Sequence, residues 1–132
     1  MNRRKIAIAI IVMLLGFSSS ALAKRISTMD FVQVQNNLYD EARFYYQQNW
    51  LQLRINALSQ GSIESYRILE IKQPTENFNF VLITTYKNQM QFDKSEDNFQ
   101  TLIAQSGGLK LLNKAKPSTF RKVIFNQTAV ED

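Results

Sequence analysis

The chain has 132 residues, with 16 Lys and Arg against 11 Asp and Glu, and it contains neither His nor Cys. The lack of both residue types excludes Ser-His-Asp and Cys-His catalysis, zinc sites built on His or Cys, and disulfides. Three of the positive charges lie at Arg3, Arg4 and Lys5, so residues 24–132 carry 13 positive against 11 negative charges. That balance lacks the concentrated basic stripe of nucleic-acid binding, and we expect no nucleic-acid partner.

The first 23 residues have the pattern of a secretory signal peptide. The three basic residues precede the twelve-residue apolar run Ile6–Phe17, and Ala21-Leu22-Ala23 forms a small-x-small cleavage pattern. Twelve apolar residues fall short of the roughly 20 that span a bilayer, which makes an uncleaved anchor the weaker alternative. We therefore predict cleavage after Ala23, a single domain over residues 24–132, and a periplasmic or secreted protein without membrane contact after cleavage.

The first predicted elements are a strand over Asp30–Asn36, after a loose lead-in at Lys24–Met29, and a helix over Asn37–Gly61 that holds the only Trp. At about 100° per residue, the apolar residues of this helix form two stripes on nearly opposite sides. The two stripes are Tyr46, Trp50, Leu53 and Ala57 on one side, and Phe44, Leu51, Ile55 and Leu58 on the other. The pattern predicts two packing partners, one for each stripe.

A second strand is predicted over Ile63–Ile71 and a third over Phe78–Tyr86, joined by a turn at Lys72–Asn77. The third strand is apolar on both faces, a pattern typical of strands that are covered on both sides. Its two faces carry Phe80, Leu82 and Thr84 on one side, and Val81 and Ile83 on the other.

The C-terminal part is predicted to form a helix over Phe92–Gln105 that ends at Gly107-Gly108, and a fourth strand over Thr119–Gln127. Between these two elements, Leu109–Asn113 is predicted to be a short helix or irregular chain. Pro117 is expected to prevent a continuous helix beyond it. Thr128–Asp132 is expected to be a polar tail. Arg121 and the nearby lysines are interrupted by apolar residues, and we expect them on the solvated surface.

The element order βαββαβ predicts an α+β fold. Right-handed crossovers turn this order into a four-stranded antiparallel sheet, with strand order 4-1-3-2 and both helices on one face. The other face would be bare in a monomer. Because the third strand is apolar on both sides, we expect a homodimer in which a second copy covers this open sheet face by two-fold symmetry.

Residues 30–127 resemble the dimeric α/β-barrel superfamily in element order, in the long aromatic first helix and in the two-sided third strand. Members of that superfamily have ferredoxin-like monomers whose sheets pack face to face. The stretches LITTYKN (Leu82–Asn88) and GGLKLLNKAKPSTFRKV (Gly107–Val123) are similar to those of small exported bacterial proteins of this type. The resemblance implies a ferredoxin-like fold and a dimeric barrel, and it carries no activity.

The superfamily includes cofactor-free monooxygenases that position an aromatic substrate with Asn, Trp, Tyr and Arg side chains between sheet and helices. The residues expected to bind a ligand here are Asn36, Tyr46, Trp50, Arg67 and Tyr86. The haem-degrading branch binds iron through a His, which this chain lacks, so we expect no cofactor and no metal. The structural alternatives are core packing for Tyr46 and Trp50, and an edge or interface salt bridge for Arg67.

Three functions follow from these observations. The leading hypothesis is an exported protein that binds a small apolar or aromatic molecule between sheet and helices. The first alternative is a cofactor-independent monooxygenase or isomerase that acts on an aromatic substrate in the same pocket. The second alternative is a structural or interaction protein with a filled core.

Overall fold

A computed structural model describes residues 23–73 and 77–132. The predicted signal peptide, apart from Ala23, and the middle of the predicted turn at Lys72–Asn77 lie outside the described residues. The elements follow in the order β1 (Ile26–Val34), α1 (Tyr39–Tyr45), the π-helical turn η1 (Tyr46–Trp50), α2 (Leu51–Ser59), β2 (Ser65–Glu70), β3 (Phe80–Tyr86), α3 (Gln89–Asp93), α4 (Ser95–Gln105), the 3₁₀ turn η2 (Leu112–Lys114), α5 (Pro117–Phe120) and β4 (Arg121–Val130).

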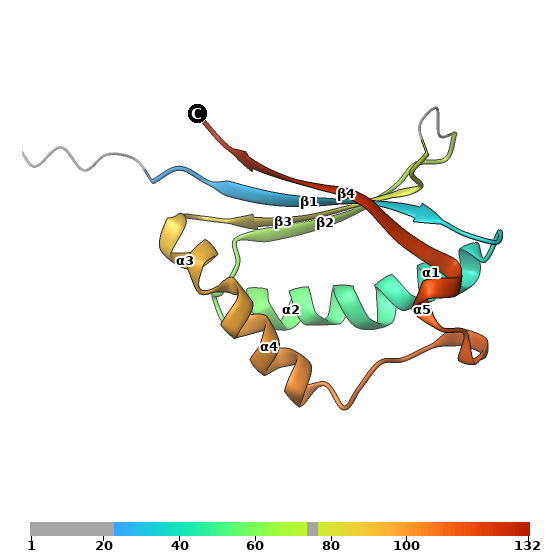
Figure 1. Cartoon of the computed structure of the whole chain (residues 1–132). Coiled ribbons are helices and arrows are strands. Elements are labelled where there is room, and N and C mark those ends of the chain that lie inside the picture. Colours follow the sequence, from blue (N-terminus) through green and yellow to red (C-terminus); the bar gives the residue numbers. More distant parts are fainter. Residues whose placement is uncertain (1–22, 74–76) are drawn as a thin grey trace, which may run out of the picture.

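The four strands form one antiparallel sheet in the order β2-β3-β1-β4. Figure 1 shows the helices on one face of this sheet, while no element of the described chain covers the opposite face. The predicted α+β class, the strand order and the one-sided helix layer are therefore confirmed. The sheet of a single chain stays open and does not close into a barrel.

Two strands extend beyond their predicted ranges. Strand β1 begins at Ile26, and β4 continues to Val130, so the expected loose lead-in and polar tail are both wrong. Ile26 is opposite Tyr86 on one side and Val130 on the other, and its side chain is buried. Strand pairing uses backbone hydrogen bonds, which polar residues such as Ser27 form as well as apolar residues do. The prediction relied on apolar alternation, which is weak at these two ends, and so it missed them.

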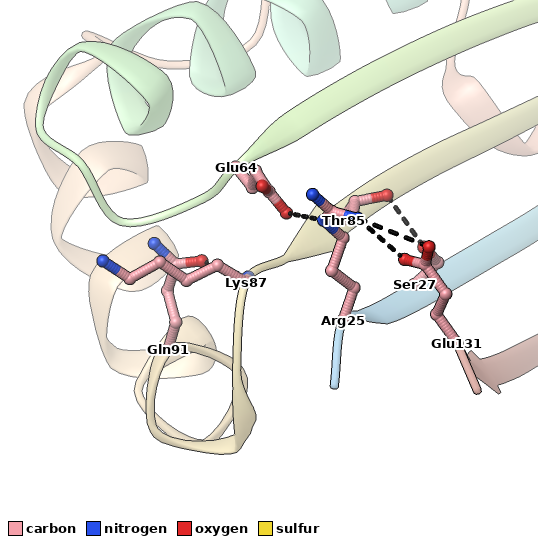
Figure 2. A network of polar contacts seen from close by, with 7 residues as sticks. All are labelled: Arg25, Ser27, Glu64, Thr85, Lys87, Gln91 and Glu131. Atoms are coloured by element: carbon pink, nitrogen blue, oxygen red, sulfur yellow. Dashed lines mark hydrogen bonds and ion pairs between the residues drawn. The ribbon is translucent and has the colours of Figure 1, made fainter. Parts of the chain in front are cut away.

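An ion-pair network ties together the ends of the strands at this edge of the molecule (Figure 2). Arg25 Nε donates to Glu64 Oε2 at 2.8 Å, and its Nη1 lies 3.2 Å from Glu131 Oε2. Beside it, Ser27 Oγ and Thr85 Oγ1 are 2.8 Å apart and link β1 to β3. The network holds the start of β1, the approach to β2 and the end of β4 in one place.

The helix-facing side of the sheet carries two buried clusters. The first contains Val32, Ala42, Tyr46, Phe80, Leu82 and Phe120, and the second contains Ala57, Ile63, Tyr86 and Leu102. Trp50 and Leu53 pack against these clusters as half-buried residues. The predicted stripe from Tyr46 to Ala57 therefore faces the sheet, as expected.

The second predicted stripe is only partly covered. Phe44 and Leu51 are half-buried, but Ile55 is 40 % exposed and Leu58 is 43 % exposed. The reason is the position of α4, whose Leu102 and Phe99 pack near Leu53 and Ala57, on the first stripe. The described chain therefore supplies a packing partner for only part of the second stripe.

The open face of the sheet has an apolar end and a polar end. Leu69, Val81, Phe31 and Phe125 are opposite one another across all four strands. The rings of Phe31 and Phe125 stack with their centroids 4.3 Å apart, and Phe78 meets both rings edge-on. At the other end, the equivalent row consists of Ser65, Thr85, Ser27 and Ala129.

Two further sequence signals have clear structural outcomes. Gly107 and Gly108 have φ values of 80° and 100° directly after α4, a conformation that ends the helix as predicted. Pro117, expected only to interrupt a helix, opens the one-turn helix α5, because the first helical position needs no amide hydrogen. Within the described ranges, no helix combines the length and apolar character required to cross a membrane.

Candidate functional site

A group of polar side chains lies on the helix-facing side of the sheet, beside the aromatic residues of the long helix. Asp30 of β1 and Thr84 of β3 lie on the same face of their strands as the buried residues that pack against the helices. Tyr46 begins η1, Arg54 lies in α2, and Arg121 is the first residue of β4. We call these five residues the interior polar cluster.

Arg54 lies between two aromatic rings. Its guanidinium carbon is 4.3 Å from the ring centroid of Trp50 and 4.1 Å from that of Phe99 on α4. Its Nε donates to Thr84 Oγ1 at 3.1 Å, and Thr84 is almost completely buried. Burial lowers the pKa of Arg54 to about 10, opposed by Tyr86 and Asp30. Arg54 therefore stays cationic at neutral pH in a poorly solvated position.

Arg121 enters the cluster from the junction of α5 and β4. The preceding Phe120 is fully buried, and its carbonyl accepts from Gln35 N at 2.9 Å, so the junction is fixed against the end of β1. Arg121 Nη2 donates to Tyr45 Oη at 3.3 Å, and its guanidinium lies 5.0 Å from the Tyr45 ring centroid. Its Nε is buried without a hydrogen-bond partner in the described chain. The expectation that Arg121 lies on the solvated surface is wrong.

Tyr46 supplies the second buried polar atom that lacks a partner. The side chain is 3 % exposed, and its hydroxyl has no hydrogen-bond partner among the described residues. Burial raises the pKa of Tyr46 well above its ordinary value. The Arg121 side chain opposes this only in part, through its positive charge and through an approach to the hydroxyl that falls short of hydrogen-bond geometry. The neutral hydroxyl is therefore available to donate or accept a hydrogen bond.

Asp30 is the carboxylate of the cluster. Burial raises its pKa, while the charges of Arg54 and Arg121 act in the opposite direction. Within the described residues, neither arginine comes within ion-pair distance of Asp30. The interior polar cluster thus combines two cations and one carboxylate that are not neutralised by direct contact.

Three of the predicted ligand residues lie on the same side of the sheet as this cluster. Tyr46 belongs to it, and Trp50 stacks on Arg54. Tyr86 is buried in the second core cluster, with its ring 5.5 Å from that of Phe92. These positions agree with a site between sheet and helices, and their ligand-binding role stays a prediction.

The other two predicted residues lie elsewhere. Asn36 is exposed in the turn after β1, and its Nδ2 donates to Thr119 O at 2.7 Å. Arg67 is exposed on the open face of the sheet, because Tyr66 and Ile68 on either side of it turn toward the helices. The structure therefore does not bring Asn36 or Arg67 together with Tyr46 and Trp50.

The sequence contained signals for the residues that our prediction missed. Arg54 follows Trp50 by four residues, which places it about 40° from Trp50 on the inward stripe. Asp30 lies on the same face of β1 as Val32 and Val34, which is the face that packs against the helices. A charged residue in phase with a buried apolar stripe is the observable signal in both cases, since unpaired charges are rarely buried.

Among the hollows of the helix layer, two lie beside the long helix. One of about 380 Å³ lies between α2 and the end of α4, and amide side chains such as Gln48, Gln52 and Asn56 line it together with Leu109. One of about 280 Å³ lies beside Tyr46, with Ile68 and Phe80 in its wall. In residues 23–73 and 77–132, no three His, Cys, Asp or Glu residues are grouped so as to hold a metal ion.

The four-stranded antiparallel sheet with its helices on one face defines a ferredoxin-like α+β fold. The chain is similar in structure to HapK from Hahella chejuensis, with a TM-score of 0.50, 11 % sequence identity and coverage of 79 % of this chain and 90 % of HapK. It is also similar to a dimeric protein of unknown function and ferredoxin-like fold from Bacteroides fragilis, with a TM-score of 0.51, 7 % identity and coverage of 83 % and 95 %.

Sequence identities this low show the fold alone, and they confirm the predicted resemblance to ferredoxin-like proteins. No protein-family model and no curated protein matches the chain. The function must therefore be argued from the residues of the site itself.

Proposed function

We propose that this protein binds a small aromatic molecule on the helix-facing side of its sheet, at the interior polar cluster. The observation that carries the proposal is a pair of buried polar atoms without partners, Tyr46 Oη and Arg121 Nε, in the same interior region. Buried polar atoms are normally hydrogen-bonded, and an unmet one costs about 1–3 kcal/mol. A bound ligand can supply the missing hydrogen-bond partners of such atoms.

The surroundings of these atoms favour an aromatic ligand. Trp50 and Phe99 present ring faces beside Arg54, and Tyr45 presents one beside Arg121. Asn126 and Thr128 of β4, which are opposite Asp30 and Thr28 of β1, are exposed, so the site has a solvent-accessible side. Aromatic walls with a few convergent polar groups are the usual composition of a small-molecule site.

Calorimetric titration of residues 24–132 tests the proposal with two probes of matched shape, 2-naphthamide and 2-naphthoate. We expect at least one of them to bind with a one-to-one stoichiometry. We expect Thr128→Trp, which places a bulky ring on the accessible side, to weaken that binding at least tenfold. The matched control Thr101→Trp, on the exposed surface of α4, should bind as the wild type does. No binding of either probe at millimolar concentration would refute the proposal.

A second candidate is catalysis at the same site, and Asp30 favours it. A carboxylate whose pKa is raised by burial moves toward the range of a general base. This candidate corresponds to a cofactor-independent monooxygenase or isomerase that removes a proton from an aromatic substrate. Oxygen uptake with 1,4-dihydroxynaphthalene, faster than in buffer and lost in Asp30→Asn, would support it, whereas an unchanged rate would exclude this reaction.

We also propose a homodimer in which the open face of the sheet is buried. The apolar row of Leu69, Val81, Phe31 and Phe125 supports this arrangement, because a contiguous apolar patch is costly to leave in water. The similar protein from Bacteroides fragilis is itself described as dimeric. A sizing experiment on wild-type protein at micromolar concentration tests the oligomeric state.

Export from the cytoplasm, with cleavage after Ala23, is part of the same proposal. In its support, Arg25 pairs with Glu64 and Glu131 and Ile26 is buried, so the residues directly after the predicted cleavage position already belong to the fold. Mass spectrometry of the protein from a periplasmic extract should find a mature chain that starts at Lys24. We expect Ala23→Leu to retain the full-length chain, and a wild-type chain that keeps residues 1–23 would contradict the proposal.

A further inference from the structure

We infer that a second site, separate from the interior polar cluster, binds a short extended segment of another polypeptide along helix α2. The site is the hollow of about 380 Å³ between α2 and the end of α4. Its volume falls within the range of ligand sites in proteins, about 300–1,000 Å³. The hollow begins at the π-helical turn η1, and single π turns inside α-helices are frequently found at functional sites.

The wall of the hollow is rich in carboxamide side chains and almost free of charge. The carboxamides come from the long helix and from the end of α4: Gln48, Asn49, Gln52, Asn56 and Gln105. Among the described residues that line the hollow, Lys110 alone carries a charge. A carboxamide has donors and an acceptor side by side, so its natural partner is a neutral group that also has both. The peptide group is such a partner.

One of these carboxamides already binds a residue of the chain itself through its backbone. Asn49 Nδ2 donates to Lys110 O at 2.8 Å, and Asn49 Oδ1 accepts from Lys110 N at 2.8 Å. Gln52 and Asn56 follow Asn49 by three and seven residues, so they lie on the same face of the helix. This face therefore offers two further carboxamides that can pair with a backbone as Asn49 does.

The spacing of Gln52 and Asn56 matches an extended peptide. The two residues are four apart in α2, which corresponds to a rise of about 6.0 Å. In an extended chain, the residues that direct N–H and C=O to the same side are two apart, or about 6.6–6.8 Å. Flexible side chains can absorb a difference of less than about 1 Å between these two repeats. A peptide that runs along α2 can thus pair alternate residues with Gln52 and then with Asn56.

Both carboxamides are available for a ligand. They are exposed to solvent, and Gln52 Nε2 makes only one long contact, of 3.4 Å, with Gln47 O. No hydrogen bond within the described chain involves the Asn56 side chain. The carboxamides therefore need not break a short hydrogen bond of the fold in order to bind a peptide.

Apolar side chains at the hollow indicate which residues the peptide carries. Ile103 is 47 % exposed and Leu109 is 61 % exposed, and both line the hollow together with Leu53. An aliphatic side chain of the ligand would remove this apolar surface from water. The ligand is therefore an uncharged extended segment that contains aliphatic residues.

The test titrates ¹⁵N-labelled protein with the peptide acetyl-Ser-Leu-Ser-Leu-Ser-amide and follows the side-chain amide signals by NMR. We expect the signals of Gln52 and Asn56 to shift in a saturable way at or below millimolar concentration. The same peptide with every backbone nitrogen methylated keeps its side chains but loses its donors. It should bind at least tenfold more weakly.

The matched variants change the carboxamides and keep the size of the side chains. Gln52→Met combined with Asn56→Leu should weaken binding of the unmodified peptide at least tenfold. Gln100→Met, on the exposed surface of α4 and outside the hollow, should bind it as the wild type does. The ¹⁵N spectrum of each variant reports whether its fold is intact, and the substituted side chains are all exposed.

Three results would overturn the inference. They are no saturable shift with up to 10 mM peptide, equal affinity for the methylated peptide, and undiminished binding by the double variant. The interior polar cluster is tested separately, because neither Arg54 nor Arg121 lines the hollow. The double variant should therefore bind the naphthyl probes as the wild type does, so either site can fail without the other.

Discussion

At the scale of single residues, Tyr45 and Tyr46 are adjacent but differ in how the fold uses their hydroxyl groups. Tyr45 Oη accepts a hydrogen bond from Arg121, whereas Tyr46 Oη is buried without a partner. We therefore expect Tyr46→Phe to raise the free energy of unfolding by about 1 kcal/mol, and Tyr45→Phe to lower it by a similar amount. Urea denaturation of the two variants checks this opposition, and a loss of stability in both would contradict it.

Asp30 makes the stability of the fold depend on pH. Burial raises its pKa above the unfolded value, so its protonated form is the better accommodated one in the folded chain. The protonated Asp30 carboxyl therefore adds its full contribution to the free energy of unfolding below the unfolded pKa, near 3.9. That contribution is lost as the pH rises through the higher pKa of the folded chain.

The prediction concerns Asp30→Asn, which keeps the shape of the side chain and removes its charge. We expect this variant to be more stable than the wild type at pH 7 and equal to it near pH 3, where Asp30 is protonated. Denaturation at the two pH values measures the difference. A variant less stable than the wild type at pH 7 would show that the attraction of Arg54 and Arg121 outweighs the cost of burial.

The site could be predicted from the sequence only in part. Trp50 and Tyr46 were predictable because their spacing places them on the stripe that meets the sheet. Arg54 and Asp30 have the same periodicity, but a charged residue in an apolar pattern is normally assigned to solvent. Arg121 could not be placed, because its burial depends on the one-turn helix α5 and on the contact between Phe120 and the end of β1.

At the scale of elements, Asn49 connects the segment after α4 to the long helix. Asn49 of η1 donates to Lys110 O at 2.8 Å and accepts from Lys110 N at 2.8 Å, and it also donates to Tyr45 O. The amide thus pairs with both backbone groups of residue 110, as a neighbouring strand would. It fixes the irregular stretch Leu109–Leu111 that forms one wall of the 380 Å³ hollow.

We expect Asn49→Ala to lower the free energy of unfolding by roughly 1–2 kcal/mol, because three hydrogen bonds are lost. The amide of Lys110 should then exchange its hydrogen much faster than in the wild type. Gln48→Ala, at the neighbouring position of η1, removes no side-chain hydrogen bond found in the described chain and should change stability by less than about 0.5 kcal/mol. Equal effects of the two substitutions would show that Asn49 does not hold the segment.

The elements themselves were largely predictable. Alternation along the third strand correctly separated Phe80, Leu82 and Thr84 from Val81 and Ile83, and the element order predicted the strand order of the sheet. The ends of β1 and β4 were missed because Ser27, Thr28 and Thr128 pair through their backbones in a polar-looking segment. The partial exposure of the second helix stripe was missed because it depends on where α4 packs. That position is set by tertiary contacts and not by the periodicity of either helix.

At the scale of the whole molecule, the two exposed apolar surfaces differ in their organisation. Leu69 belongs to a row that crosses all four strands and continues into the Phe31, Phe78 and Phe125 cluster. Ile55 lies on the outer side of α2, away from the sheet. Because the first surface runs across all four strands, a second copy can bury it by two-fold symmetry.

Leu69 and Ile55 form a matched pair for testing the dimer, since they are 42 % and 40 % exposed. We expect Leu69→Lys to convert the dimer to a monomer, because the two-fold axis would bring two lysines into one apolar interface and leave both charges poorly solvated. Ile55→Lys should keep the mass of two chains, since its side chain stays in water. Light scattering after size exclusion measures both masses at equal concentration. A wild-type protein with the mass of one chain would refute the dimer itself. Dissociation by Ile55→Lys but not by Leu69→Lys would place the interface on the helix layer and leave the open sheet face without a role in assembly.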